Sequence, residues 1–186
     1  MLTSRFSKQM DIEKQQYPIG IYSSPDVITG NVLSQWIEDI SSFPKRIRKV
    51  VLDLTDEQLD TPYRQGGWTV RQVVHHCADS HMNSLMRFKL TLTEENPTIK
   101  PYLQDRWVEL PDSKNAPIES SLKMLEGIHE RWSILLNSFT EADLHKTFSH
   151  PEHGRGFRLD DTIGSYAWHC NHHLAHITEL KKRMNW

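Results

Sequence analysis

Four long stretches of the chain repeat apolar residues with the period of an α-helix, and this pattern limits the fold most strongly. The stretches cover about residues 30–54, 69–93, 117–136 and 160–183. Apolar residues that recur every three or four positions form a stripe along a helix, and that stripe must be buried against other elements. Strand patterns are weak throughout. The chain is therefore predicted to be all-α, with its helices packed as a four-helix bundle.

The ends of these helices carry recognisable signals. Thr69 followed by Gln72 is the pattern of a capping box, and Thr140 followed by Asp143 predicts a short capped turn. Pro44 lies inside the first stretch and should kink or restart that helix. The connection over about residues 94–116, and the one before the fourth helix, are long enough to permit crossovers.

The size of the chain, 186 residues, fits a single domain. Residues 1–29 lack a sustained period and are expected to form an N-terminal extended segment packed on the bundle, with the domain itself over 30–186. The net charge of −2 argues against a nucleic-acid partner or an anionic membrane. No window reaches the roughly 18 apolar residues of a membrane span, and none resembles a signal peptide. A cytoplasmic location is therefore expected, and Cys77 and Cys170 are interpreted as packing residues.

Eleven histidines stand out in the composition, and four of them fall between His169 and His176. The apolar stripe of the fourth helix consists of Ile163, Ala167, Cys170, Leu174 and Ile177. His169 and His173 are four residues apart on one shoulder of this stripe, whereas His172 points away from the core. The pair His169/His173 is therefore favoured over His172/His176 as a metal-binding pair, because i, i+4 spacing stacks two side chains within reach of one ion.

The second helix offers the third candidate ligand. His76 begins a polar stripe beside the apolar face, which continues through Ser80, Asn83 and Arg87. His81 falls within the apolar stripe and is interpreted as a hydrogen-bonded core residue, with a supporting role beside a metal left open. His75 and His172 are expected in solvent. No convergent spacing is found for His129, His145, His150 and His153.

A site with three imidazole ligands leaves coordination positions for water, which is typical of catalytic metal sites, whereas structural zinc sites usually have four protein ligands. Neutral imidazole suits zinc, nickel, copper and iron. If His81 or His176 supplied a fourth ligand, the site would be closed, and the chain would be a non-catalytic metal-binding protein.

Two segments, GGWTVRQVVHHCADSH and WHCNHHLAHITEL, resemble the two motifs of the DinB-like superfamily of four-helix bundles. The chain is also similar to the YfiT-type metal-dependent hydrolases in that superfamily, over most of its length. The resemblance implies a DinB-type bundle with crossover connections and a metal held by His76, His169 and His173. It further implies zinc as the expected ion, with nickel as an alternative, and a homodimer.

The leading hypothesis is a metal-dependent hydrolase of a small-molecule substrate, because a three-histidine zinc site lowers the pKa of its bound water to about 7. The alternative is a metal-dependent S-transferase that uses a low-molecular-weight thiol such as bacillithiol. The sequence has no His-Glu-x-x-His motif, so no general base comes with the ligands. Asn83, Arg87 and Tyr166 are weak candidates for catalytic roles, and no further cofactor is expected.

Overall fold

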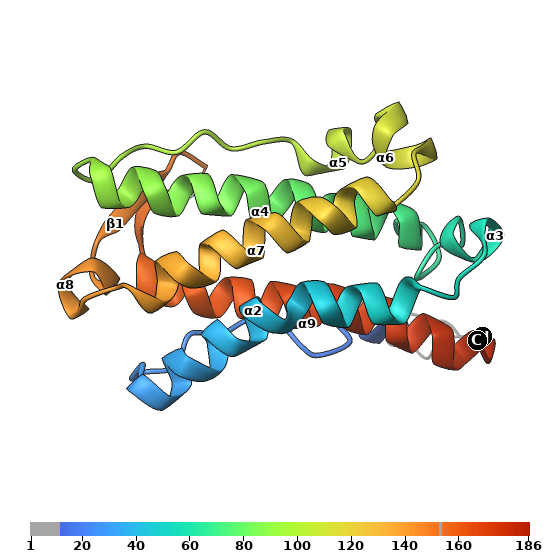
Figure 1. The fold of residues 1–186 in the computed structure, drawn as a ribbon, viewed down its shortest axis with the longest axis horizontal. Coiled ribbons are helices and arrows are strands. Elements are labelled where there is room, and N and C mark those ends of the chain that lie inside the picture. Colours follow the sequence, from blue (N-terminus) through green and yellow to red (C-terminus); the bar gives the residue numbers. More distant parts are fainter. Residues whose placement is uncertain (1–11, 153) are drawn as a thin grey trace, which may run out of the picture.

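The computed structural model describes residues 12–152 and 154–186, and Figure 1 shows a bundle of four long helices. These helices are α2 (Gly30–Val51), α4 (Val70–Thr93), α7 (Glu119–Asn137) and α9 (Leu159–Met184). Shorter helices lie in the connections: α3 (Asp56–Leu59), α5 (Gln104–Trp107), α6 (Pro111–Asn115) and α8 (Glu141–Leu144). The predicted four-helix bundle is thereby confirmed.

The topology of the bundle contains crossovers, because helices that follow one another in the chain are not always neighbours. Both α2 and α4 pack against α7 and α9. The chain therefore crosses the bundle diagonally from α2 to α4 and again from α7 to α9. In Figure 1, α2 and α9 run in one direction and α4 and α7 in the other. This arrangement places α4 and α9, which carry the candidate ligands, side by side and antiparallel.

A two-stranded sheet was not expected from the sequence. The antiparallel strands β1 (Thr147–His150) and β2 (Arg155–Arg158) pair with Phe148 opposite Phe157, and the two rings stack with centroids 5.5 Å apart. Each strand has only four residues, which is too short for alternating hydrophobicity to give a clear pattern. The hairpin leads directly into α9.

The beginning of α4 has the predicted capping box. The Gln72 backbone N–H donates to Thr69 Oγ1 over 3.1 Å, and the Thr69 backbone N–H donates to Gln72 Oε1 over 2.9 Å. The same pattern caps α8 at Thr140, with Asp143 as its partner. These bonds satisfy N–H groups that have no partner within the helix, and they fix where α4 begins relative to the aromatic residue before it.

Pro44 was predicted to kink or restart the first helix, and it does not restart it, since α2 continues through this residue. Proline lacks the N–H that would pair with the carbonyl of the residue four positions earlier, here Ile40. That carbonyl has a different partner, an imidazole of α7, described below.

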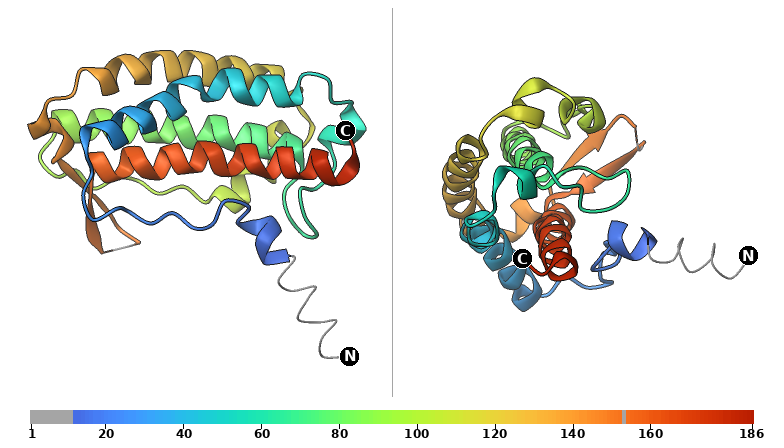
Figure 2. Two further views of the ribbon diagram at one scale, coloured as in Figure 1. Left: turned by 90° about the horizontal axis from the view of Figure 1, so that it is seen from below. Right: turned by 90° about the vertical axis from the view of Figure 1, so that its right-hand side faces the viewer.

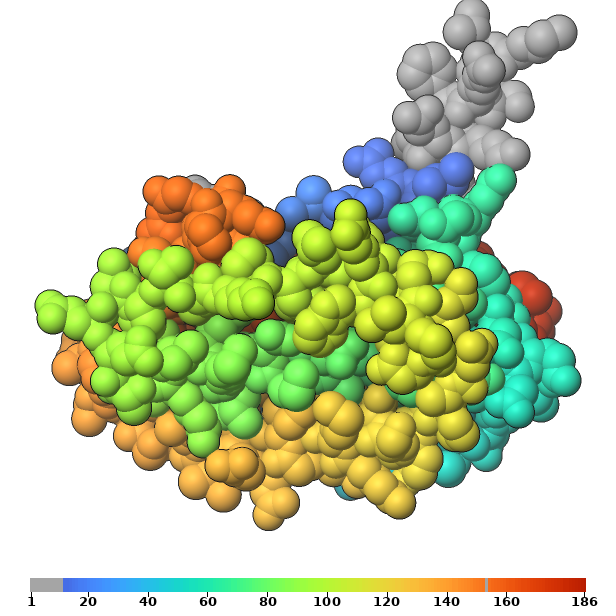
Figure 3. Space-filling view, turned by 90° about the horizontal axis from the view of Figure 1, so that it is seen from above, coloured from blue at the N-terminus to red at the C-terminus, as the bar shows by residue number. Residues whose placement is uncertain are grey.

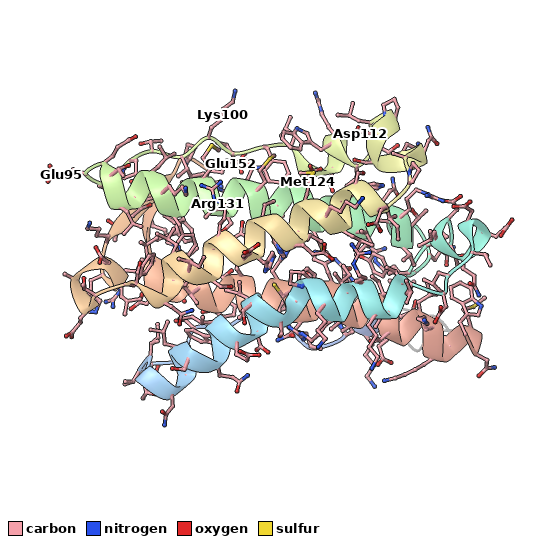
Figure 4. The ribbon with its side chains drawn as sticks, viewed as in Figure 1. Glu95, Lys100, Asp112, Met124, Arg131 and Glu152 are labelled. Carbon is pink, nitrogen blue, oxygen red and sulfur yellow. The ribbon has the colours of Figure 1, made fainter. Side chains whose placement is uncertain are left out.

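The long connection between α4 and α7 returns along α4 to the other end of the bundle (Figure 1). Ile99 and Val108 anchor it, with exposed fractions of 2% and 1%. Lys100, next to Ile99, points away from the bundle, as does Glu95 (Figure 4). This connection therefore covers a face of α4 that the periodicity alone leaves open to solvent.

The described part of the N-terminal segment lies along α9 (Figure 2). Trp168 Nε1 donates to the carbonyl of Gly20 over 3.1 Å, and the Tyr22 hydroxyl donates to Asp161 Oδ1 over 2.8 Å. Residues 12–16 are helical, so the segment is not extended throughout, and residues 1–11 lie outside the described residues. Within the described ranges, no helix is long and apolar enough to cross a membrane.

The side chains of all four long helices fill the interior (Figure 4), and the largest completely buried ones include Trp132, Phe43, Phe88, Ile47 and Leu125. Cys77 and Cys170 are buried among them, as predicted.

At Gly164 of α9, the N-terminal segment and α2 both lie close to that helix. A Cβ atom there would lie 2.5 Å from the Tyr22 hydroxyl and 2.7 Å from the Trp36 ring. We expect Gly164→Ala to lower the free energy of unfolding by about 1–3 kcal/mol through overpacking, although alanine favours helix by about 1 kcal/mol. Urea unfolding measures this difference.

The matched control is Gly127→Ala in α7, where a Cβ would meet nothing within 4 Å. This substitution should raise the free energy of unfolding by up to about 1 kcal/mol. A Gly164→Ala protein as stable as Gly127→Ala would contradict the packing described.

Candidate metal centre

Three imidazoles from two helices converge in the interior of the bundle. His76 lies in the second turn of α4, and His169 and His173 lie one turn apart on α9. One ring nitrogen from each residue can be chosen so that all three lie within 4.8 Å of one another. His76 Nε2 is 3.2 Å from His169 Nε2. The structure thus brings together the three residues selected from the sequence.

These nitrogens suit a divalent ion in number, type and spacing. Nitrogen ligands lie about 2.0–2.1 Å from zinc, so two ligands of a tetrahedral ion are roughly 3.3 Å apart. The Nε2–Nε2 distance of 3.2 Å between His76 and His169 is close to that spacing. With a proton on one of these nitrogens the pair forms a hydrogen bond, and with both lone pairs free a cation can bind between them.

The three rings are held in the neutral form that a metal requires. Burial lowers the pKa of His76 to about 3, with smaller contributions from His172 and His176. Burial also lowers the pKa values of His169 and His173 well below the usual range, and the neighbouring imidazoles add to the effect. Lone pairs are therefore present at neutral pH, because a charged imidazole would lose its hydration without an opposite charge.

Trp68 forms an aromatic wall beside the ligands. Its ring lies 4.6 Å from that of His76 and is stacked on His173 at 6.3 Å, measured between centroids. Trp68 directly precedes the capping residue Thr69, so the capping box that begins α4 also places this ring.

Two cavities adjoin the three histidines. The first, the histidine cavity, has a volume of about 380 Å³ and is lined by all three, together with Trp68 and Asp105. The second, the outer cavity, has a volume of about 690 Å³ and is also lined by His169. The connection between α4 and α7, the β hairpin and the N-terminal segment surround the outer cavity, and all three lie on the face seen in Figure 3. A small molecule could therefore reach the histidines.

The three residues proposed from the sequence for catalytic roles differ in position. Arg87 and Tyr166 line the outer cavity with His169, and the Tyr166 ring lies 5.6 Å from the His169 ring. The Arg87 Nε atom is buried and has no hydrogen-bond partner within the described residues. Asn83 donates to the backbone carbonyl of Asp79 within α4 and lines neither cavity.

Two histidines predicted to lie in solvent are buried instead. His75 is 5% exposed, and its ring bonds to the Ser121 hydroxyl at 2.7 Å and the Ala116 carbonyl at 3.2 Å. His172 is 7% exposed and stacks on Trp168 at 4.3 Å. His75 is covered by α7 and the connection before it, and Tyr17 of the N-terminal segment lies 6.0 Å from the His172 ring, measured between centroids. Helical periodicity carries no information about such covering.

His81 is the core residue expected from its position, because it is completely buried and hydrogen-bonded. Its Nδ1 lies 2.7 Å from His129 Nε2, and its Nε2 lies 3.0 Å from His169 Nδ1. His176 has a comparable place beside His173, with their Nδ1 atoms 3.3 Å apart. Both residues therefore support candidate ligands through hydrogen bonds.

Sequence reasoning missed His129 and Asp105. His129 is 1% exposed and joins the buried imidazoles from α7, but it has no second histidine at helical spacing to mark it. Asp105, on the short helix α5, lines both cavities and is the one carboxylate among the described residues of the histidine cavity. Asp105 reaches the two cavities only because the connection between α4 and α7 folds back along α4.

Known proteins resemble this chain closely. The family model of the DinB superfamily matches residues 40–177. A protein of Bacillus mycoides is 55% identical over 171 residues, which are 92% of this chain and 98% of that protein, and a protein of Bacillus cereus is 57% identical over the same shares. Both carry the name "Putative metal-dependent hydrolase".

A solved structure, YfiT from Bacillus subtilis, superimposes with a TM-score of 0.91 at 48% identity, covering 93% of this chain and 99% of that one. It is described as a probable metal-dependent hydrolase with an unusual four-helix bundle topology.

The buried imidazoles should make the metal-free protein sensitive to acid. The pKa values of eight histidines are lowered: His75, His76, His81, His129, His169, His172, His173 and His176. The unfolded chain takes up protons near pH 6.5, whereas the folded chain does not. The contribution of these histidines to the free energy of unfolding is therefore fully present above about pH 7. As the pH falls below 6.5, the free energy of unfolding decreases by up to about 1.4 kcal/mol per pH unit for each histidine.

Urea unfolding with a chelator present, followed by circular dichroism at pH 7.5, 6.0 and 5.0, measures this loss. The interval from pH 8.5 to 7.5 is the control, since histidines contribute no change there. A free energy of unfolding that stays constant or rises as the pH is lowered from 7.5 to 5.0 would show that the imidazoles are not buried as neutral groups.

Proposed function

The chain belongs to the DinB superfamily, and we propose that it is a metal-dependent hydrolase whose single divalent ion is held by His76, His169 and His173. The observation that carries this proposal is the convergence of the three ring nitrogens within 4.8 Å, from neighbouring helices. The names of the relatives and of the structural neighbour agree with it. Zinc is the proposed ion, with nickel as the alternative, because both accept neutral imidazole ligands.

An open coordination position is supported by the hydrogen bonds of His81 and His176. Both ring nitrogens of His81 are engaged, one with His129 and one with His169. His176 is similarly engaged with His173 and with the backbone carbonyl of Gln16. Neither is free to act as a fourth ligand, which favours a catalytic site over a closed structural one.

The chemistry that a divalent ion supplies in such a site is Lewis-acid activation of water and of the bond to be hydrolysed. Asp105 is proposed to accept the proton released from the attacking water, because its carboxylate lines both cavities. Arg87 is proposed to hold an anionic group of the substrate, since its Nε is buried without a partner among the described residues. Tyr166 is proposed to orient the substrate beside His169.

A thiol S-transferase is the second candidate, because the same arginine suits the carboxylate of a thiol cofactor. In either case the substrate is proposed to be a small molecule that enters through the outer cavity. The homodimer expected from the resemblance stays a prediction.

We expect His169→Ala and His173→Ala each to lower bound metal well below one ion per chain, because two remaining imidazoles hold an ion much more weakly than three. Elemental analysis of the purified proteins measures the metal content. His172→Ala is the matched control on the same helix and should retain one ion. Unchanged metal in both ligand variants would exclude this ligand set.

The hydrolase proposal is tested with zinc-loaded and nickel-loaded protein, a panel of ester, amide and phosphoester substrates, and bacillithiol with an electrophile as the competing assay. We expect release of hydrolysis products without consumption of the thiol. Asp105→Asn should lose about 100-fold or more in rate, the usual contribution of a general base, while it retains one ion per chain.

The control for a loss caused by misfolding is the thermal unfolding midpoint of Asp105→Asn, which should match that of the parent protein. Conjugation of the thiol in the absence of hydrolysis would overturn the hydrolase proposal in favour of the transferase.

A further inference from the structure

Pro44 has a consequence for the metal centre. Because proline has no N–H, the carbonyl of Ile40 lacks the helix bond that residue 44 would otherwise donate. His129 Nδ1 lies 2.6 Å from this carbonyl oxygen, and both residues are buried. A carbonyl oxygen can only accept a hydrogen bond, so Nδ1 of His129 must carry the proton.

The protonation of His129 decides that of the next two rings. A neutral imidazole has one donor and one acceptor nitrogen, and burial without a counter-charge keeps these rings neutral. His129 Nε2 must then accept from His81 Nδ1, 2.7 Å away. His81 Nε2 in turn must accept from His169 Nδ1, 3.0 Å away. His169 therefore carries its proton on Nδ1, which leaves a lone pair on Nε2.

The second ligand of α9 is anchored in the same way from the N-terminal segment. His176 Nε2 lies 3.0 Å from the backbone carbonyl of Gln16 and must donate to it. His176 Nδ1 is then the acceptor, and it lies 3.3 Å from Nδ1 of His173. His173 therefore also carries its proton on Nδ1, with its lone pair on Nε2.

We propose that His81, His129 and His176 are positioning residues, which form two histidine relays that fix the tautomers of His169 and His173 before a metal binds. The relays are Ile40 carbonyl–His129–His81–His169 and Gln16 carbonyl–His176–His173, and both end on backbone carbonyls. This inference rests on the proposed metal site. In water, imidazole prefers the tautomer with its proton on Nε2, which would block the atom that faces His76.

The composition of the relays affects the charge of the site as well. A metal-bound histidine usually donates its other N–H to a carboxylate, a backbone carbonyl or water. Here His169 and His173 donate to neutral imidazoles instead, so the relays bring no negative charge to the metal. An ion in this site keeps more of its positive charge, which favours the activation of water.

The tautomers can be read directly in the metal-free protein by long-range ¹H–¹⁵N correlation spectra of the histidine rings at pH 8. We expect the proton on Nδ1 of His169, His173, His81 and His129, and on Nε2 of His176. A proton on Nε2 of His169 or His173 would overturn the proposal.

Zinc affinity, measured by competition with a chromophoric chelator, tests whether the relays matter for binding. His81→Leu removes the acceptor for His169 and should weaken zinc binding about 10- to 100-fold, the usual effect of losing such a partner. His81→Gln is the matched control, because an amide can both donate to His129 and accept from His169. The zinc affinity of His81→Gln should stay within a few-fold of that of the parent protein.

His176→Phe repeats the test at a less buried position and keeps the ring that stacks on Tyr63 at 3.8 Å, so it is the variant of choice if His81→Leu does not fold. Its partner control is His176→Gln. Zinc affinity unchanged in the folded Leu or Phe variant would contradict the proposal. Neither readout uses a substrate, so an inactive protein with the expected tautomers would contradict the proposed hydrolase function alone.

Discussion

The structure depends on the burial of imidazoles inside a helical bundle. Each buried ring has two nitrogens that lose their hydration, and each nitrogen needs a partner to recover that cost. Hydrogen bonds to carbonyls, to hydroxyls and to other imidazoles meet this requirement for most of the rings. The Nε2 atoms of His76 and His169 face each other at 3.2 Å and share one hydrogen bond when one of them carries the proton. A divalent ion bound there would take the place of that proton, so the fold and the proposed metal site are parts of one arrangement.

The diagonal crossovers make this arrangement possible. They place α4 and α9 side by side, so that a candidate ligand from one helix meets two from the other. They also require a long connection between α4 and α7, which covers His75 and brings Asp105 to the histidines. The N-terminal segment completes the other side through the bond from His176 to Gln16. The proposed site therefore uses elements from nearly the whole chain.

Much of this could be predicted from the sequence, and the remainder could not for physical reasons. Helical period and capping residues predicted the four helices, because those signals are local. The spacing of His169 and His173 predicted a metal-binding pair, and the polar stripe of α4 added His76. The burial of His75 and His172 was missed, since it depends on segments that only the tertiary fold brings over them. The interaction of His129 with Ile40 was missed because it needs both the proline and the packing of α2 on α7.

The proposed metal centre binds one divalent ion through Nε2 of His76, His169 and His173 and leaves a coordination position open. A crystal structure of the zinc-loaded protein, with anomalous scattering recorded at the zinc edge, tests it most directly. We expect a single anomalous peak about 2.0–2.1 Å from these three Nε2 atoms, with no fourth protein ligand. A peak at His172 and His176, binding through Nδ1 of His169 or His173, or a fourth protein ligand would contradict it.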